Sequence, residues 1–445
     1  MHPYIAQTLE TVEKRNHSEP VFLQAVREVI TTLEPILAEH PEIEDLNLLE
    51  RMCEPERQVI FRVVWRGDDG KVRSTRGFRI EFSSVLGPYK GGLRFQPVVN
   101  MGVMKFLGFE QVFKNSLTGL NIGGGKGGAE FEPYGKSDDE VMRFCQAFMS
   151  ELYRHIGEQR DVPAGDMGVG AREIGYLFGQ YKRLTNRYEM GVLTGKSVGW
   201  GGSLARMEAT GYGVVYFTQE MLKTRGESVE GKRVIVSGAG NVATYAMKKL
   251  TELGAKVVAC SDITGTLYHE DGIDVSVIKH LAEVERKHIR AYCDHHRDAT
   301  FRLGAKVWNV PCDLAFPCAT QNELDGKDAK ELIDNGVQLI CEGANMPCTP
   351  DAMEAFRAAG ILFGPAKAAN AGGVAVSALE MQQNAGLEQW TFKQVDHELQ
   401  KIMQRIFSQC THYAEKYATP TDYAAGANIA GFLRVAQAMI SHGLI

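Results

Sequence analysis

Residues 236–243 read Val-Ser-Gly-Ala-Gly-Asn-Val-Ala, a Gly-x-Gly-x-x-Ala pattern that follows a short apolar run and opens a helix. In such a pattern Gly238 permits a tight turn, Gly240 lets the backbone approach a pyrophosphate, and Ala243 lets the helix pack closely on the strand. The positive end of the helix then faces the phosphate charge. Asp262 ends the next apolar run, where an acid accepts hydrogen bonds from a ribose. The stretch therefore predicts a dinucleotide-binding site.

The chain around this motif alternates between short apolar runs and helical segments. Apolar runs recur at 232–237, 256–260, 313–318 and 337–341. Strands that are apolar throughout are typical of a parallel sheet with helices on both faces. The second half of the chain therefore predicts a Rossmann-like α/β domain. It begins after the glycine-rich stretch 198–203, which we expect to be a hinge.

Composition limits the classes of protein. The 445-residue chain is 44% hydrophobic and 23% charged, with a formal net charge of −6. These values are typical of a globular protein with a large core, and the acidic balance argues against a nucleic-acid-binding protein. No apolar run approaches the ~20 residues of a membrane span, and the first residues do not resemble a secretory signal. The nine cysteines are scattered without a Cys-x-x-Cys pair, so we expect a reduced, cytoplasmic chain.

The first 200 residues show a different pattern, in which helices and a few strands are separated by glycine-rich stretches. We expect helices from Ser18-Glu19-Pro20, over 100–118 and from the capping residue Ser137 to about Ile156, strands over 59–66 and 77–84, and glycine-rich loops near 86–92, 119–128 and 163–170. Together the two halves predict an α/β protein of two domains.

Two lysines in the first half are set among glycines. Lys90 lies in Gly-Pro-Tyr-Lys-Gly-Gly, and Lys126 lies in Gly-Gly-Gly-Lys-Gly-Gly. Because glycines provide no side chains, we expect backbone or ligand to approach Lys126, to desolvate its amine and to lower its pKa, which suits acid–base chemistry. The alternative is a solvated lysine on an exposed loop. A phosphate-binding P-loop does not fit, since Gly127 stands where Ser or Thr is required.

A third glycine-containing stretch, 161–170, holds a candidate acid–base carboxylate. Asp166 lies between glycines and apolar residues, where burial raises a carboxyl pKa and allows it to shuttle a proton. The alternative is that Asp166 caps the helix that begins near Arg172. Elsewhere, the run Cys293-Asp294-His295-His296 lacks the ligand spacing of a recognised metal site, so the sequence predicts no metal.

The residues at the end of the second apolar run bear on the choice between NAD and NADP. Asp262 favours NAD, because an acid accepts from the ribose hydroxyls and repels the additional phosphate of NADP. Ser261, Arg286 and Lys287 are placed where they can help to bind such a phosphate. Spacing alone therefore favours NAD.

Seven blocks of sequence resemble the hexameric bacterial glutamate dehydrogenases, particularly the NADP-dependent type, and the resemblance covers essentially the whole chain. The blocks are 87–95, 105–128, 161–170, 209–213, 238–243, 342–345 and 370–383. This resemblance implies the reversible oxidative deamination of L-glutamate to 2-oxoglutarate and ammonia, with NADP rather than NAD as the cofactor. It also implies a homo-hexamer that binds small molecules and neither nucleic acid nor membrane.

The resemblance further implies roles for individual residues. Lys126 activates water and stabilises the carbinolamine, and Asp166 acts as general acid and base on the substrate nitrogen. The substrate-binding residues are Gln111 and Lys114 for the α-carboxylate, Lys90 and Ser377 for the side-chain carboxylate, and Gly165 through its backbone. The cofactor-binding residues are Thr210, Gly238, Gly240, Asn241, Val242, Ser261, Asp262 and Asn345. Lys136 or Arg286 pairs with the additional phosphate of NADP and so offsets the repulsion from Asp262.

The domain ranges also follow from the resemblance. We expect residues 1–200 and a returning C-terminal helix, 424–445, to form a substrate-binding and oligomerisation domain. Residues 201–423 then form the dinucleotide-binding domain.

Two alternatives to this function are considered. The first is another amino-acid dehydrogenase, acting on leucine, valine or phenylalanine, which needs no group for a side-chain carboxylate. The second is a catalytically silent nucleotide-sensing protein, which needs neither Lys126 nor Asp166.

Overall fold

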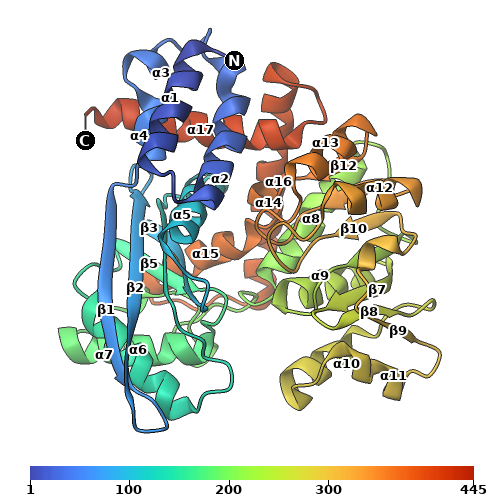
Figure 1. Cartoon of the computed structure of the whole chain (residues 1–445), viewed down its shortest axis with the longest axis horizontal. Coiled ribbons are helices and arrows are strands. Elements are labelled where there is room, and N and C mark those ends of the chain that lie inside the picture. The colour runs from blue at the N-terminus through green and yellow to red at the C-terminus, as the bar shows by residue number, and fades with distance from the viewer. Residues whose placement is uncertain (445) are drawn as a thin grey trace. The chain divides into compact units, whose positions relative to one another are not determined.

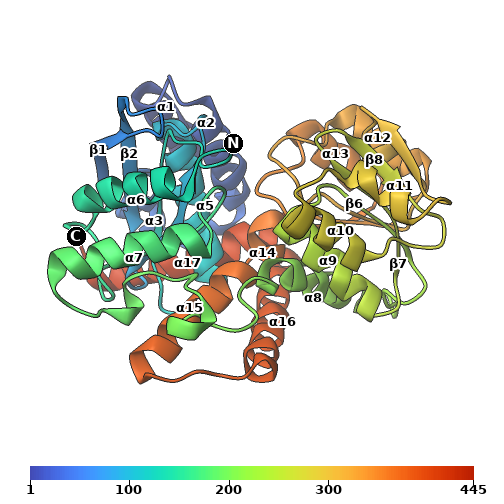
Figure 2. The same ribbon diagram turned by 90° about the horizontal axis from the view of Figure 1, so that it is seen from below.

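The computed structural model describes residues 1–444, apart from the side chain of Glu283. Contacts within the chain divide it into two compact units (Figures 1 and 2). Unit 1 comprises Met1–Arg206, Val374–Val395 and Asn428–Ile445, and unit 2 comprises Met207–Gly373 and Asp396–Ala427. This division differs from the expected ranges in three places. The first boundary follows Arg206, residues 374–395 belong to unit 1, and the returning C-terminal part of unit 1 begins at Asn428 rather than at residue 424.

The expected hinge, residues 198–203, lies within unit 1 and is held there by a helix from later in the chain. Ser203 Oγ accepts a hydrogen bond from Gln383 Nε2 at 2.8 Å, and Gly201 O accepts one from Asn384 Nδ2 at 2.7 Å. These bonds explain why the change of unit comes a few residues after the glycines.

Unit 1 is a five-stranded sheet with helices on both faces. Its strands are β1 (Arg57–Arg66), β2 (Val72–Ser83), β3 (Tyr89–Phe95), β4 (Gly124–Ala129) and β5 (Asp161–Gly165), in the order β1-β2-β4-β3-β5. The β1–β2 and β2–β4 pairs are antiparallel, whereas β3 pairs in parallel with both β4 and β5. The two predicted strands, 59–66 and 77–84, are confirmed as parts of β1 and β2, which form a hairpin that Figure 1 shows as a long ribbon at one edge of the sheet.

The helices and turns of unit 1 come from three parts of the chain. They are α1 (Pro3–Arg15), α2 (Pro20–Ile30), η1 (Thr31–Ile36), α3 (Glu42–Asp45), α4 (Leu48–Cys53), α5 (Met101–Leu117), α6 (Asp138–Leu152), α7 (Ala171–Thr185), η2 (Met190–Val192), η3 (Val198–Trp200), most of α15 (Gly372–Gly386) and most of α17 (Tyr423–His442).

Local capping sets where the two central helices begin. Helix α5 starts after Asn100, whose side chain accepts from Val103 N, and α6 starts after Ser137, whose hydroxyl accepts from Glu140 N at 3.1 Å. The end expected for the second helix, Ile156, is wrong by one turn, since α6 ends at Leu152. Helix α2 begins at Pro20, as expected, but Glu19 rather than Ser18 occupies its N-cap position.

Each of the three stretches expected to be a glycine-rich loop overlaps a strand, so this expectation is wrong for residues 89–92, 124–128 and 163–165. Residues 89–95, 124–129 and 161–165 are β3, β4 and β5. Their glycines are needed because the strands and α5 approach without room for side chains. A Cβ on Gly91 would collide with the carbonyl oxygen of Gly125, and one on Gly124 would lie 2.9 Å from the Val112 backbone. At these positions glycine allows the neighbouring strands and α5 to pack closely, and it does not mark a flexible loop.

Unit 2 contains the Rossmann-like domain. Its strands are β6 (Arg233–Val236), β7 (Lys256–Asp262), β8 (Gly265–Tyr268), β9 (Thr300–Leu303), β10 (Leu314–Phe316), β11 (Leu339–Cys341) and β12 (Leu362–Gly364), in the order β12-β11-β10-β6-β7-β8-β9. The first five in this order are parallel, as predicted, and β8 and β9 add an antiparallel extension at one edge.

Helices cover both faces of the unit 2 sheet (Figure 2). They are α8 (Ala209–Lys223), α9 (Asn241–Glu252), α10 (Val275–His280), η4 (Leu281–Glu285), η5 (Ile289–Ala291), α11 (Tyr292–His295), η6 (Val307–Asn309), α12 (Gly326–Asp334), α13 (Pro350–Ala358), α14 (Ala366–Ala369) and most of α16 (Phe392–Tyr417). The apolar strands are buried between these layers, with Ile235 and Ile340 packed against Leu332 and Phe356. In residues 1–444 we find no helix long and apolar enough to cross a membrane.

Candidate active site

Strands β4 and β5 bring the expected lysine and aspartate of unit 1 into direct contact. Lys126 Nζ lies 2.6 Å from Asp166 Oδ2. Arg94, on β3, donates from Nε to the same oxygen at 3.1 Å. Lys126 and Arg94 are buried, and the Asp166 side chain keeps only 20% of its surface exposed. The parallel pairing of β3 with both β4 and β5 brings these three side chains together.

The two members of this pair are shifted away from their ordinary pKa values by burial and by each other. Burial lowers the pKa of the Lys126 amine, although Asp166 partly offsets this. For Asp166, burial acts to raise the pKa, but Lys126 and Arg94 outweigh it and hold the pKa below its usual range. The raised pKa expected for Asp166 is therefore wrong, because two buried cations share its oxygen.

The capping interpretation of Asp166 is also wrong. Helix α7 begins at Ala171 after Gly170, and it is Glu173 that accepts from Gly170 N, at 2.9 Å. Asp166 thus lies outside the helix terminus, and its charge is satisfied by the lysine and the arginine.

Lys90 and Ser377, far apart in sequence, meet in the interior of unit 1. Lys90 is fully buried on β3 and donates to Val162 O at 3.0 Å and to Thr194 Oγ1 at 2.8 Å. Thr194 Oγ1 in turn lies 3.4 Å from Ser377 Oγ on α15, which also accepts from Arg206 Nε at 3.0 Å. Two cations and two hydroxyls therefore converge, as the recognition of a carboxylate requires.

Burial lowers the pKa values of both cations in this cluster. Burial lowers the pKa of Lys90 well below its ordinary value, and the nearby Arg206 adds to this effect. Burial also lowers the pKa of Arg206, an effect that Glu380 and Asp166 oppose. A buried anion at this place would relieve the repulsion between the lysine and the arginine.

A buried ion pair fixes the segment that carries Thr194. Glu380 accepts from Gly195 N at 3.0 Å and pairs with Lys196 Nζ at 2.7 Å, and neither ionic side chain is exposed. Because Glu380 lies on α15 one turn after Ser377, the pair holds the threonine and the serine in register.

The other residues expected to bind the substrate lie on α5 and at the end of β5. Gln111 on α5 donates to Asn115 Oδ1 at 2.6 Å, and Asn115 in turn donates to Lys90 O at 3.1 Å. Lys114, one turn after Gln111, is buried on α5, and Gly165 is the last residue of β5, next to Asp166.

The dinucleotide motif of unit 2 has the geometry that its sequence predicts. Gly238 follows β6 with φ +86°, and α9 begins at Asn241 with Gly240 as its N-cap. A Cβ on Gly240 would enter open space, so this backbone is accessible to a phosphate group. Ala243 is fully buried. Strand β6 has β7 on one side and β10 on the other, so the motif lies where the strand order reverses, and the residues fit a dinucleotide.

The end of β7 lies next to this turn. Ser261 Oγ accepts from Gly238 N at 3.2 Å, which ties the turn to the strand. Asp262 Oδ1 accepts from Thr264 N at 2.7 Å, and Oδ2 accepts from Ile289 N at 3.1 Å and faces His288 Nδ1 at 3.2 Å. The ionisable partner of Asp262 is thus His288.

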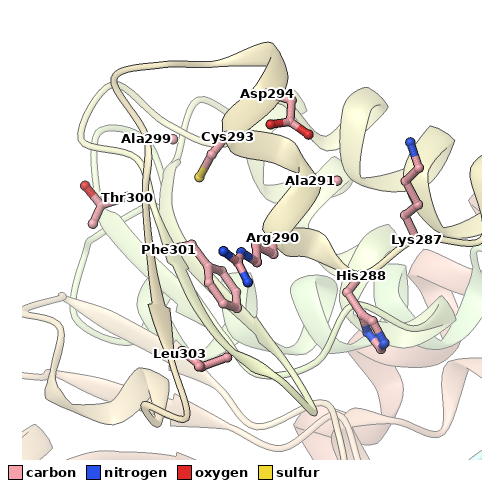
Figure 3. Close-up of a pocket in the computed structure, with 10 residues that line it drawn as sticks. All are labelled: Lys287, His288, Arg290, Ala291, Cys293, Asp294, Ala299, Thr300, Phe301 and Leu303. Carbon is pink, nitrogen blue, oxygen red and sulfur yellow. The ribbon is translucent and has the colours of Figure 1, made fainter.

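The two residues expected to pair with the additional phosphate belong to different units. Lys136 belongs to unit 1 and pairs with Glu140 at 3.4 Å, and Arg286 is an exposed residue with φ +53°. Beyond His288 the chain lines a pocket of about 750 Å³, into which the Arg290 side chain points (Figure 3). Lys287, Phe301 and Leu303 also line it.

The remaining expected cofactor residues all belong to unit 2. Thr210 is in the first turn of α8. Asn241 donates from Nδ2 to Met207 O at 2.7 Å, and Asn345 Oδ1 accepts from Asn370 Nδ2 at 3.0 Å. A Cβ on Gly343 would lie 3.1 Å from Val242, so the segment after β11 approaches the start of α9.

The family of the chain follows from comparison with known proteins. A family model described as Glutamate/Leucine/Phenylalanine/Valine dehydrogenase matches residues 201–443, and a second, described as Glu/Leu/Phe/Val dehydrogenase, dimerisation domain, matches residues 55–183. The chain belongs to the Glu/Leu/Phe/Val dehydrogenase family.

Individual relatives of this dehydrogenase cover its full length. It is 53% identical to the NADP-specific glutamate dehydrogenase of Helicobacter pylori over 99% of this chain and 100% of that protein. It is 52% identical to the NADP-specific glutamate dehydrogenase of Escherichia coli over 98% of each. The crystal structure of Plasmodium falciparum glutamate dehydrogenase superposes with a TM-score of 0.97, at 51% identity, over 99% of this chain and 95% of that one. The predicted family and fold class are confirmed.

Sequence reasoning missed four residues of this dehydrogenase's site. Thr194 and Arg206 complete the cluster around Lys90, Arg94 contacts Asp166, and Glu380 holds the Thr194 segment. Arg94 and Glu380 stand within two of the seven blocks that the sequence singled out, 87–95 and 370–383, but neither was assigned a role. Nothing in the spacing of Thr194 and Arg206 distinguishes them from surface residues.

Proposed function

We propose that this dehydrogenase catalyses the NADP-dependent, reversible oxidative deamination of L-glutamate to 2-oxoglutarate and ammonia. The observation that carries the proposal is the buried cluster of Lys90, Thr194, Ser377 and Arg206, which offers two cations and two hydroxyls to a second carboxylate. The names of the relatives agree with this substrate.

The contact between Lys126 and Asp166 supports an acid–base mechanism. Asp166 is ionised at neutral pH because its pKa is held low, so it accepts a proton from the substrate ammonium group. Bound nicotinamide supplies a hydride acceptor. Lys126, with its lowered pKa, then directs a water molecule to the Cα carbon and stabilises the carbinolamine oxygen. Asp166 returns its proton to the nitrogen as ammonia leaves.

The two ends of the substrate are held by different elements in this proposal. Gln111 and Lys114 on α5, with the backbone of Gly165, bind the α-carboxylate, and Lys90 with Ser377 and Arg206 binds the side-chain carboxylate. A buried carboxylate without such partners would be costly, so these groups select an acidic side chain over an apolar one.

NADP binding is supported by the basic residues that follow Asp262. Lys287, His288 and Arg290 occupy one short segment, and the backbone of Ile289 is anchored on Asp262 itself. The hydrogen bonds that Asp262 accepts from Thr264 and Ile289 satisfy its charge, so the acid repels an added phosphate less. Gly238, Gly240, Asn241 and Val242 cradle the pyrophosphate, and Thr210 and Asn345 contact the rest of the cofactor.

We further propose a homo-hexamer located in the cytoplasm. The match of residues 55–183 to a dimerisation domain supports self-association. Strand β1, within that range, is an edge strand whose exposed side carries Ile60 and Val64, a surface suited to pairing with a second copy.

The test is an assay of nicotinamide absorbance with L-glutamate, L-leucine, L-valine and L-phenylalanine, each with NADP and NAD. We expect glutamate with NADP to give the highest kcat/KM, with 2-oxoglutarate and ammonia as products. A higher value for an apolar amino acid would support the other branch of the family. No turnover with any pair would support a nucleotide-sensing protein.

A further inference from the structure

A cluster of two histidines and one aspartate lies in unit 2, outside the proposed active site. His269 follows β8, whereas His296 and Asp298 belong to the turn between α11 and β9. Within the cluster, ligand atoms of the three side chains all lie within 4.8 Å of one another. His269 is buried, and its Nε2 is 2.8 Å from Asp298 Oδ2. The atoms therefore converge from two separate segments.

The orientation of the buried histidine, His269, is set by a tyrosine hydroxyl group. His269 Nδ1 lies 3.0 Å from Tyr292 Oη, and that oxygen is fixed by a hydrogen bond from Asp274 N at 2.8 Å. A metal-binding histidine characteristically donates its second ring N–H to a fixed oxygen, which sets the tautomer and aims the other nitrogen at the metal. Tyr292 Oη supplies such an acceptor for Nδ1–H, which directs Nε2 towards Asp298, where a bound metal would separate the two.

Stacking fixes the second histidine. The ring of His296 stacks on that of Tyr292, with centroids 4.5 Å apart and planes inclined by 18°. The same tyrosine thus positions both imidazoles, by a hydrogen bond to one and by ring contact with the other. Asp298 is the exposed member, with 63% of its side-chain surface accessible, so it can rotate to admit an ion.

We propose that His269, His296 and Asp298 form a binding site for a divalent transition metal, of which Zn²⁺ fits best. Two imidazole nitrogens and one carboxylate oxygen are ligands that Zn²⁺ accepts in tetrahedral geometry, with water as the fourth ligand. Mg²⁺ and Ca²⁺ prefer oxygen ligands and are disfavoured.

The site would cross-link the end of β8 to the turn that precedes β9. The segment between them contains α10, η4, η5 and α11, and it includes His288 and Ile289, which contact Asp262. Bound metal would therefore stabilise the segment that bears the cations proposed for NADP. This metal site itself rests on geometry independent of the proposed function.

The test is Zn²⁺ binding by the full-length protein after treatment with EDTA and removal of the chelator. Competition with a chromophoric chelator gives stoichiometry and affinity, and the visible spectrum of the Co²⁺-loaded protein reports its coordination geometry. The variants are His296→Ala and Asp298→Asn. His295→Ala is the matched control, because His295 is the exposed neighbour of His296 and is not part of the cluster.

We expect one Zn²⁺ to bind each wild-type chain and each control chain with equal affinity, and to raise their thermal midpoints. Each cluster variant should bind at least about tenfold more weakly and lose the tetrahedral Co²⁺ spectrum. The proposal is overturned if the wild type binds no Zn²⁺, or if His295→Ala weakens binding as much as His296→Ala. Because the readout is metal binding, failure here leaves the dehydrogenase proposal standing.

Discussion

Lys126 Nζ and Arg94 Nε both contact Oδ2 of Asp166, at 2.6 and 3.1 Å. One oxygen of the carboxylate thus carries both cations, and the backbone of Met167 also donates to the group. The sharing also keeps the carboxyl group ionised, since protonation would have to displace two charge-assisted contacts. The carboxylate is thereby prepared to act as a base before substrate arrives.

Lys126→Ala should abolish turnover and leave cofactor binding nearly unchanged. Acid–base and electrostatic contributions are worth roughly 10²–10⁴-fold each, and Lys126 belongs to unit 1, whereas the dinucleotide motif belongs to unit 2. Steady-state kcat and the dissociation constant for NADP, from fluorescence titration, check this. A variant that retains more than about a tenth of the wild-type rate would contradict the role of Lys126.

Arg94→Gln should move the acid limb of the kcat/KM profile to higher pH. In the wild type, Lys126 and Arg94 lower the pKa of Asp166, and the nearby Arg206 acts in the same direction. Removing one cation raises that pKa towards its ordinary value, so Asp166 becomes protonated, and the enzyme loses activity, at a higher pH than before. Arg76→Gln is the control, because Arg76 pairs with Glu130 on the surface. An acid limb that stays in place in Arg94→Gln, or moves equally in the control, would count against this account.

Glu380→Gln should destabilise the protein by about 3–5 kcal/mol, because it leaves the Lys196 ammonium group buried without its counter-ion. The change should also weaken glutamate binding, since Glu380 anchors the Thr194 segment. Denaturant unfolding and KM for glutamate measure the two effects. Glu398→Gln removes an exposed helix pair with Lys401 and should cost less than about 1 kcal/mol. Equal losses in the two variants would refute a structural role for the buried pair.

Lys287→Gln combined with Arg290→Gln should reduce kcat/KM for NADP more than for NAD. Each charge-assisted hydrogen bond to the additional phosphate is worth about 1.5–3 kcal/mol, or roughly 10–150-fold. The KM for glutamate should change little, because both residues belong to unit 2. The comparison is the ratio of kcat/KM for the two cofactors. An equal fractional loss of kcat/KM for both cofactors would mean that Lys287 and Arg290 do not bind the additional phosphate.

The nucleotide-binding half was predictable from sequence because its signals are local. A strand, a glycine turn and a helix follow one another in 236–243, and each residue needs only its neighbours to take its conformation. In the first half, the glycine blocks identified Lys90, Lys126 and Asp166 but were assigned to loops. Glycine permits both a loose turn and a close approach of strands, and only the pairing partners distinguish the two.

Non-local contacts account for what sequence could not provide. Thr194 and Arg206 join the site through hydrogen bonds with Ser377 on α15, a helix of unit 1 that comes much later in the sequence. The sign of the Asp166 pKa shift depended on Lys126 and Arg94, whose proximity is set by strand order rather than by spacing. His269 and His296 likewise meet only because β8 lies beside β9.

The most direct test of the account is the ratio of kcat/KM for glutamate to that for norleucine, in the wild type and in the double variant Lys90→Leu with Ser377→Val. A buried site built to bind a polar group rejects an analogue without it by about 10⁴-fold or more, so the wild type should strongly prefer glutamate. The double variant should lose most glutamate activity and gain weak norleucine activity, with Lys126 and Asp166 unchanged. If the double variant kept the wild-type ratio of kcat/KM for glutamate over norleucine, the claim that this cluster binds the side-chain carboxylate would be contradicted.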